Sequence, residues 1–135
     1  MKEMTLEAKI ENIPRVTAFI DEQLEALDCP MKAQMQIDVA IDELFGNISH
    51  YAYAPGSGEA TVGFDFDETA RTISVVFSDR GVPFDPLGRT DPDVGAPAQE
   101  RDIGGLGIFL VKKTMDSLEY RFENGKNVLT IKKKI

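Results

Sequence analysis

The feature that most constrains the fold is a pair of hairpin patterns, one in the middle of the chain and one at its end. Residues 61–66 and 71–77 are rich in β-branched and aromatic side chains and flank a turn at 67–70. Residues 120–123 and 128–131 flank Asn124-Gly125, a favoured pair for a tight turn. Because hairpins join antiparallel neighbours, the chain is predicted to form a mostly antiparallel sheet.

Three segments with apolar residues at steps of three and four predict amphipathic helices. The first covers about 13–27, with Asn12 as its N-terminal cap, and the second runs from Pro30 to a break at 55–58. The third opens at Gly104 and is expected to bury Ile108, Val111, Met115 and Leu118. Residues 2–10 alternate and predict one more strand, with Met4, Leu6, Ala8 and Ile10 on its apolar side.

The order of these elements is strand, helix, helix, hairpin, loop, helix and hairpin. This order predicts an α/β two-layer sandwich, in which a mostly antiparallel mixed sheet carries three helices on one face. Residues 1–135 are expected to form a single domain, because compact domains hold about 100–150 residues around one core. The loop from 79 to 103 exceeds the roughly 12–15 residues of ordinary connections, which indicates a functional loop.

The balance of charges excludes some classes of partner. The formal net charge of −8 disfavours nucleic acids and anionic membrane surfaces. Cys29 is the single cysteine and cannot form an internal disulfide, and no stretch approaches the roughly 20 apolar residues of a membrane span. With no secretion-signal pattern at the start, we expect a cytoplasmic protein without a membrane association.

Two groups of side chains could carry chemistry in the first half of the chain. Glu43 and Asn47 are four residues apart on one helix, so they share a face. A glutamate can accept a proton, and an amide oxygen can bind a hard cation such as Mg²⁺. Asp79 ends an apolar strand, and a buried carboxylate needs donors such as a ligand amino group, while Gly81 permits close approach of a planar ligand. Each group alone is also compatible with a solvated helix face or an ordinary turn.

A third group lies at the start of the last predicted helix. Gly104-Gly105-Leu106-Gly107 would expose free backbone N–H groups at the positive end of the helix, an arrangement that favours phosphate. The pattern is not a P-loop, because no Gly-Lys-Ser/Thr follows it, and the chain lacks the strand and helix alternation of a Rossmann unit.

Taken in order, these residues resemble the motifs of the GHKL (Bergerat-fold) ATPases. The segment 42–47 resembles the N box, 79–83 the first glycine box and 104–107 the second. Within that superfamily, the short chain and the segments 42–53 and 104–112 resemble the anti-sigma factor serine/threonine kinases. The resemblance covers nearly the whole chain.

The resemblance implies a role for each matched residue. Glu43 would be the catalytic base toward a Ser or Thr hydroxyl or a water, and Asn47 would hold the Mg²⁺ that bridges the phosphates of ATP. Asp79 would receive the adenine amino group, with Gly81 and Pro83 in the same box. The segment 85–103 takes the place of the ATP lid, and the phosphates would contact the second box, formed by Gly104, Gly105, Leu106 and Gly107.

Other implications concern partners and alternatives. Arg101 precedes the second box, and it could contact a γ-phosphate or a partner or have only a surface role. Lys126-Asn127 stands where the family often has Gly-Thr. The resemblance implies a homodimer that binds a sigma factor and phosphorylates an antagonist protein of the anti-sigma factor. An ATP-binding partner switch without phosphotransfer and a detached histidine-kinase catalytic domain are the alternatives.

Overall fold

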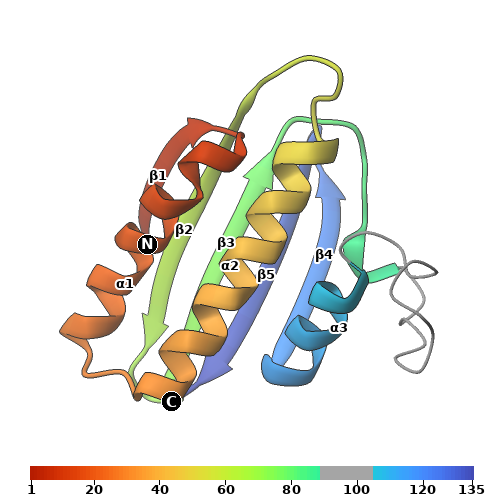
Figure 1. Cartoon of the computed structure of the whole chain (residues 1–135). Helices are drawn as coiled ribbons and strands as arrows, with labels where there is room; N and C mark the ends of the chain where they lie inside the picture. Colours follow the sequence, from red (N-terminus) through yellow and green to blue (C-terminus); the bar gives the residue numbers. More distant parts are fainter. Residues whose placement is uncertain (89–104) are drawn as a thin grey trace.

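The structure is a computed structural model, and it describes residues 1–88 and 105–135. Within these two ranges, one sheet carries three α-helices on a single face (Figure 1). The strands are β1 Lys2–Glu7, β2 Glu59–Asp67, β3 Thr72–Asp79, β4 Ser117–Glu123 and β5 Lys126–Lys134. The helices are α1 Ile13–Ala26, α2 Met31–Tyr51 and α3 Gly105–Thr114, with short 3₁₀ turns at Ile10–Asn12 and Pro86–Gly88.

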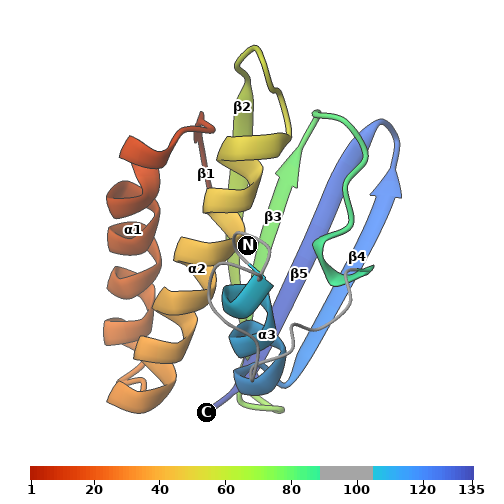
Figure 2. The same cartoon turned by 45° about the vertical axis from the view of Figure 1, so that its right-hand side comes forward.

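The sheet order in the described part of the chain is β1-β2-β3-β5-β4, and each neighbouring pair is antiparallel. The last strand therefore lies in the interior of the sheet, beside β3, and Asp79 pairs with Asn127 across these two strands. Seen from the side in Figure 2, the helices form one layer and the sheet the other. The predicted two-layer α/β fold is confirmed.

Local turn chemistry explains why both hairpins form as predicted. In the first turn, the Asp67 carboxylate accepts hydrogen bonds from the backbone N–H groups of Thr69 at 3.0 Å and Ala70 at 3.1 Å. In the second turn, Asn124 and Gly125 have φ angles of 54° and 76°. Asparagine and glycine tolerate this left-handed conformation better than other residues, so the Asn-Gly pair suits the turn.

The core lies between the helix layer and the sheet. In α1 and the first half of α2, buried residues recur at the spacing of one helix face, whereas all four residues from Leu44 to Asn47 are buried. The fully buried side chains of these two helices meet the inward-facing residues of the strands. The helices contribute Val16, Ile20, Leu24, Ile37 and Ile41, and the strands contribute Val62, Val75, Phe77 and Ile131. Burying each such side chain stabilises the fold by about 1.5–3 kcal/mol.

The first strand is shorter than predicted. It ends at Glu7, and Ile10 lies in a 3₁₀ turn with 42% of its surface exposed instead of on a buried face. Asn12 precedes α1 but does not cap it, because its backbone is already helical, with φ −91° and ψ −5°. Its side-chain amide donates to the Glu7 carbonyl instead, at 2.8 Å.

One apolar residue, Leu118, also lies elsewhere than predicted. Leu118 was expected on the buried face of the last helix, but α3 ends at Thr114 and Leu118 pairs with Ile131 in the β4–β5 hairpin. Tyr51, which continues the apolar spacing of α2, is 39% exposed because it lies in the last turn of that helix. None of the helices in the described ranges is long and apolar enough to cross a bilayer.

Candidate functional site

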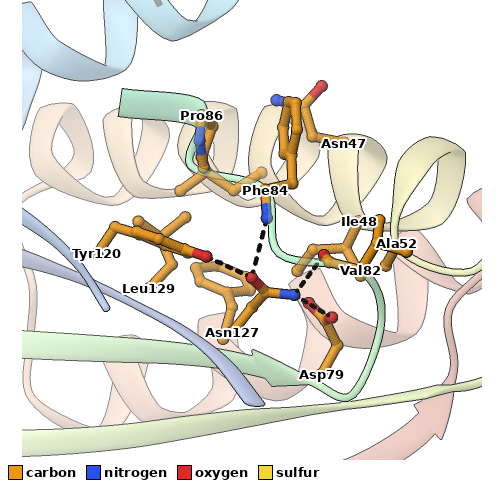
Figure 3. Close-up of a pocket in the computed structure, with 12 residues that line it drawn as sticks. Asn47, Ile48, Ala52, Asp79, Val82, Phe84, Pro86, Tyr120, Asn127 and Leu129 are labelled. Atoms are coloured by element: carbon orange, nitrogen blue, oxygen red, sulfur yellow. Dashed lines mark hydrogen bonds between the residues drawn. The ribbon is translucent and has the colours of Figure 1, made fainter. Parts of the chain in front are cut away.

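A pocket lies between the C-terminal half of α2 and the ends of β3, β4 and β5 (Figure 3). The cavity between its walls is narrow, with a volume of about 30 Å³. Most of its lining is apolar, and the polar exceptions are Asn47, Asp79, Tyr120 and Asn127. The apolar lining residues are Leu44, Ile48, Ala52, Phe77, Val82, Phe84, Pro86 and Leu129.

Asp79 is the last residue of β3 and is only 6% exposed. Its burial follows from the alternation of the strand, because Asp79 takes the same inward face as Val75 and Phe77. One carboxylate oxygen, Oδ1, accepts hydrogen bonds from the Gly81 N–H and from the Asn127 side-chain amide, both at 2.9 Å. These donors offset the cost of taking a carboxylate out of water.

Asn127 is a site residue that the sequence did not identify as one. Its Nδ2 donates to Asp79 and, at 2.9 Å, to the Val82 carbonyl, while its Oδ1 accepts from the Phe84 N–H at 3.1 Å and from the Tyr120 hydroxyl. Asn127 is 6% exposed and shares the inward face of β5 with leucine and isoleucine. The available signal in the sequence is a polar residue within the apolar alternation of this strand, at a position where the family often has Gly-Thr.

The surroundings of Tyr120 change the pKa of its hydroxyl. Burial raises the pKa of Tyr120 above its ordinary value, and the carboxylates of Asp85 and Asp79 raise it further, whereas a hydrogen bond with the backbone of Phe84 lowers it. A protonated phenol donates to an amide oxygen, which is the bond that Tyr120 makes to Asn127.

The turn after β3 is held against the end of α2. A Cβ atom on Gly81 would lie 2.1 Å from the Ala52 carbonyl oxygen, so no side chain fits there. The neighbouring Val82 N–H donates to the same oxygen at 2.9 Å, and the Tyr53 hydroxyl accepts from the Arg80 N–H at 2.8 Å. Gly81 is therefore required by packing against α2, and its predicted contact with a ligand stays a prediction.

Pro83 lies apart from the other predicted residues of this motif. It is exposed, whereas its neighbours Val82 and Phe84 line the pocket. Its predicted contribution to ligand binding stays a prediction.

Asn47 and Glu43 occupy successive turns of α2. Asn47 is 8% exposed and lines the pocket, and its Nδ2 atom is buried without a hydrogen-bond partner among the described residues. Glu43 is half-buried and lies against the first turn of α3, where a Cβ atom on Gly107 would be 2.1 Å from its Oε2. Gly107 thus leaves the space that the Glu43 carboxylate occupies, and the fold brings two of the predicted motifs together.

The remaining predicted residues fall at or beyond the edge of the described ranges. Gly105 and Leu106 begin the backbone of α3, so the predicted helix start is present. Gly104, Arg101 and most of the predicted 85–103 lid lie outside the described residues. Of the lid, residues 85–88 are described, and they contain a single 3₁₀ turn at Pro86–Gly88, with Pro86 in the pocket wall.

These residues combine a narrow apolar slot that holds one buried carboxylate with a helix start that contains glycines. An apolar slot with one buried carboxylate matches a ring that carries an amino group. A helix start with glycines matches an anion, because its N–H groups are free and its end is positive. In the described parts of the chain, no group of three His, Cys, Asp or Glu side chains could hold a metal by itself.

Asn47, whose side-chain nitrogen has no partner among the described residues, is compatible with a divalent cation shared with phosphates. Mg²⁺ prefers oxygen ligands and typically takes only one or two from the protein, with phosphate and water supplying the others. A carboxamide presents one oxygen and one nitrogen that exchange by rotation about the side chain, and here the Asn47 nitrogen has no hydrogen bond within the described residues to fix it. The donor set therefore fits a cation held mainly by a bound nucleotide.

Comparison with known proteins finds one matching family model and several similar protein kinases. Residues 6–133 match the family model described as Histidine kinase-like ATPase domain. The chain is 27% identical over 100 residues to the serine/threonine-protein kinase BtrW of Bordetella bronchiseptica, covering 74% of this chain and 70% of that protein.

Two serine-protein kinases named RsbW are similar to the chain as well. The protein from Halalkalibacterium halodurans is 29% identical over 129 residues, which cover 91% of this chain and 76% of that kinase. The protein from Bacillus cereus is 31% identical over 98 residues, which cover 70% of this chain and 60% of that kinase.

Proposed function

Since the chain belongs to the histidine kinase-like ATPase family, we propose that it is an ATP-dependent serine/threonine protein kinase that acts as an anti-sigma factor. Family membership confirms the sequence-based resemblance to the GHKL ATPases. The kinase activity is supported by the relatives, which are named serine or serine/threonine kinases. The observation that carries the proposal is the contact of Glu43 with Gly107, because it sets a carboxylate at the helix start where phosphates would bind.

ATP would bind with its base in the pocket and its phosphates toward α3. The Oδ2 oxygen of Asp79 would accept the adenine amino group, since the two bonds described above both end on Oδ1. Gly105 and Gly107 would donate backbone N–H groups to the phosphates, together with the adjacent Gly104 and Leu106. Asn47 would hold Mg²⁺ through its amide oxygen, and the bound ion neutralises phosphate charge. Arg101 is a further candidate for the γ-phosphate.

Glu43 would act as the general base of the phosphoryl transfer. Its carboxylate takes the proton of a Ser or Thr hydroxyl on the protein substrate while that oxygen forms a bond to the γ-phosphorus. The bond from the γ-phosphorus to the bridging oxygen breaks, and ADP leaves with that oxygen. Such a reaction requires mainly positioning and charge neutralisation, so few side chains suffice.

The partners proposed for this activity are proteins. The chain would bind a sigma factor and release it when the antagonist protein, which is also the phosphorylation substrate, competes for binding. We also propose that it works as a cytoplasmic homodimer. The net charge of −8 supports protein partners over a direct contact with nucleic acid.

Replacement of the proposed base tests the catalytic claim. Glu43→Gln keeps the size of the side chain and removes its basicity, so phosphotransfer to a purified antagonist protein should fall by about 10²–10⁴-fold. Binding of Mg-ATP should stay within about twofold of the unchanged chain, because the pocket around Asp79 is untouched. Phosphoserine is measured by mass spectrometry, and Glu22→Gln, the same change on the exposed face of α1, is the matched control.

Two outcomes would contradict the proposal. Equal transfer by Glu43→Gln and the unchanged chain would show that Glu43 is not the base. Intact ATP binding with no transfer by the unchanged chain would instead identify an ATP-dependent partner-binding module.

A further inference from the structure

We propose that Asn127 is a positioning residue that fixes the Asp79 carboxylate in the orientation that selects adenine over other purines. The inference rests on the proposed function, namely that the pocket binds ATP. Asn127 faces Asp79 directly in the register of β3 and β5, and both side chains are 6% exposed. The two groups therefore meet where water is largely excluded, and a hydrogen bond there is directional and costly to lose.

The orientation of the Asn127 amide is determined by its neighbours. A backbone N–H can only donate, so the Phe84 N–H identifies the atom 3.1 Å away as the amide oxygen. With the amide placed in this way, the Tyr120 hydroxyl donates to the same oxygen. The amide nitrogen must then face the opposite way, toward Asp79 and the Val82 carbonyl, each at 2.9 Å.

The fixed amide in turn restricts Asp79. Together with the Gly81 N–H, it supplies two donors to Oδ1, so rotation of the carboxylate would break two hydrogen bonds. An ionised carboxylate only accepts hydrogen bonds, so Oδ2 matches the exocyclic amino group of adenine. The same Oδ2 atom would repel the carbonyl oxygen that guanine or hypoxanthine carries at this position, because both atoms are acceptors. Specificity then comes from a carboxylate that cannot turn away from the wrong base.

Asn127 also links this carboxylate to the mouth of the pocket. Its contacts join β5 to Val82 and Phe84 in the turn after β3 and to Tyr120 on β4 (Figure 3). A hydroxyl-bearing residue at this position would offer one donor and could not make all of these bonds at once.

A comparison of two nucleotides separates positioning from general support of the pocket. ATP carries the 6-amino group, whereas purine riboside triphosphate lacks it and is otherwise the same molecule. In the unchanged chain, ATP should bind at least about tenfold more tightly, the value of one hydrogen bond to a charged group. Asn127→Ala should lower the affinity for ATP by about tenfold and leave that for purine riboside triphosphate within about twofold.

Tyr120→Phe and Thr130→Ala complete the experiment. Tyr120→Phe removes one of the two donors to the Asn127 oxygen, so it should lower the preference for ATP by a smaller factor even if Asn127→Ala folds poorly. Thr130→Ala lies on β5 at a half-buried position between the inward-facing Leu129 and Ile131 and should change neither affinity. Affinities are measured by titration calorimetry with Mg²⁺.

The outcomes distinguish this inference from the proposed function. An equal fall in both affinities in Asn127→Ala, or an unchanged preference in Asn127→Ala or in Tyr120→Phe, would overturn the positioning role while ATP binding stands. Failure of the unchanged chain to bind either nucleotide would overturn the proposed function and this inference together.

Discussion

Asp79 and Asp38 are two carboxylates set into the same domain, one at the end of an interior strand and the other on α2 facing α1. Asp79 is the more buried, yet two N–H donors meet its Oδ1 oxygen. Asp38 is half-buried, and its Oδ1 and that of Asp21 have no hydrogen-bond partner among the described residues. Burial, followed by the neighbouring carboxyl of Asp21 and the charge of Glu25, raises the pKa of Asp38 to about 7.

The difference shows that burial alone does not decide how a carboxylate behaves. At Asp79, a turn and a cross-strand amide each supply a donor to one carboxylate oxygen. Between α1 and α2, Asp38 lies near the carboxyl of Asp21 and the charge of Glu25, so the acid pair is relieved by taking up a proton. The first arrangement fits a binding site, and the second gives a stability that depends on pH.

The largest expected effect comes from breaking the donor arrangement at Asp79. Gly81→Ala would place a methyl group 2.1 Å from the Ala52 carbonyl oxygen, so the turn must move and the Gly81 N–H must leave Asp79. We expect a loss of about 2–3 kcal/mol in the free energy of unfolding, measured by urea denaturation. The affinity for ATP should fall as well.

Gly46→Ala is the matched control for this substitution. A Cβ atom on Gly46 meets only the tip of Ile10, at an ordinary 3.9 Å, and the residue lies inside α2. The control should stabilise the protein by up to about 1 kcal/mol, because alanine favours the helix. A Gly81→Ala protein as stable as the unchanged chain would contradict the packing role of Gly81.

The second prediction removes the acid pair. The pKa of Asp38 is raised from 3.8 to about 7 on folding, so between these values the folded state binds more protons than the unfolded state. Its contribution is therefore favourable below about pH 4 and is lost as the pH rises through about 7. Asp38→Asn should raise the free energy of unfolding at pH 8 by about 1–2 kcal/mol, a value reduced for solvent screening.

The measurement is urea denaturation at pH 5 and pH 8. Asp38→Asn should show a smaller difference between the two pH values than the unchanged chain. Asp42→Asn, the same change at an exposed position of the same helix, should leave that difference as it was. The claim that Asp38 and Asp21 destabilise the fold at high pH would be contradicted if the unchanged chain became more stable from pH 5 to pH 8 and Asp38→Asn gave no gain at pH 8.

The sequence predicted the parts of the fold that depend on local chemistry. The hairpins around Asp67 and Asn124 followed from turn residues, and the helix pattern through Ile37 and Ile41 followed from spacing. Leu118 was assigned to a helix because a step of three from Met115 fits a helix as well as a strand. Such a step cannot show that the helix ends at Thr114.

The site was predicted less completely, for a related reason. Glu43, Asn47 and Asp79 lie in motifs that are contiguous along the chain, so the resemblance to the GHKL ATPases could propose them, and their roles stay predictions. The contact between Asp79 and Asn127 joins residues 48 positions apart and depends on the register of β3 against β5, which no local pattern specifies. The packing of Gly81 on Ala52 depends in the same way on how the turn meets α2.

Titration calorimetry of the full chain with Mg-ATP tests the central claim, the adenine site at Asp79, most directly. The chain should bind ATP saturably, and Asp79→Asn should weaken that binding by at least about tenfold, because the charged acceptor for the amino group is lost. Absence of affinity in the unchanged chain at millimolar ATP, or equal affinity in Asp79→Asn, would contradict the claim.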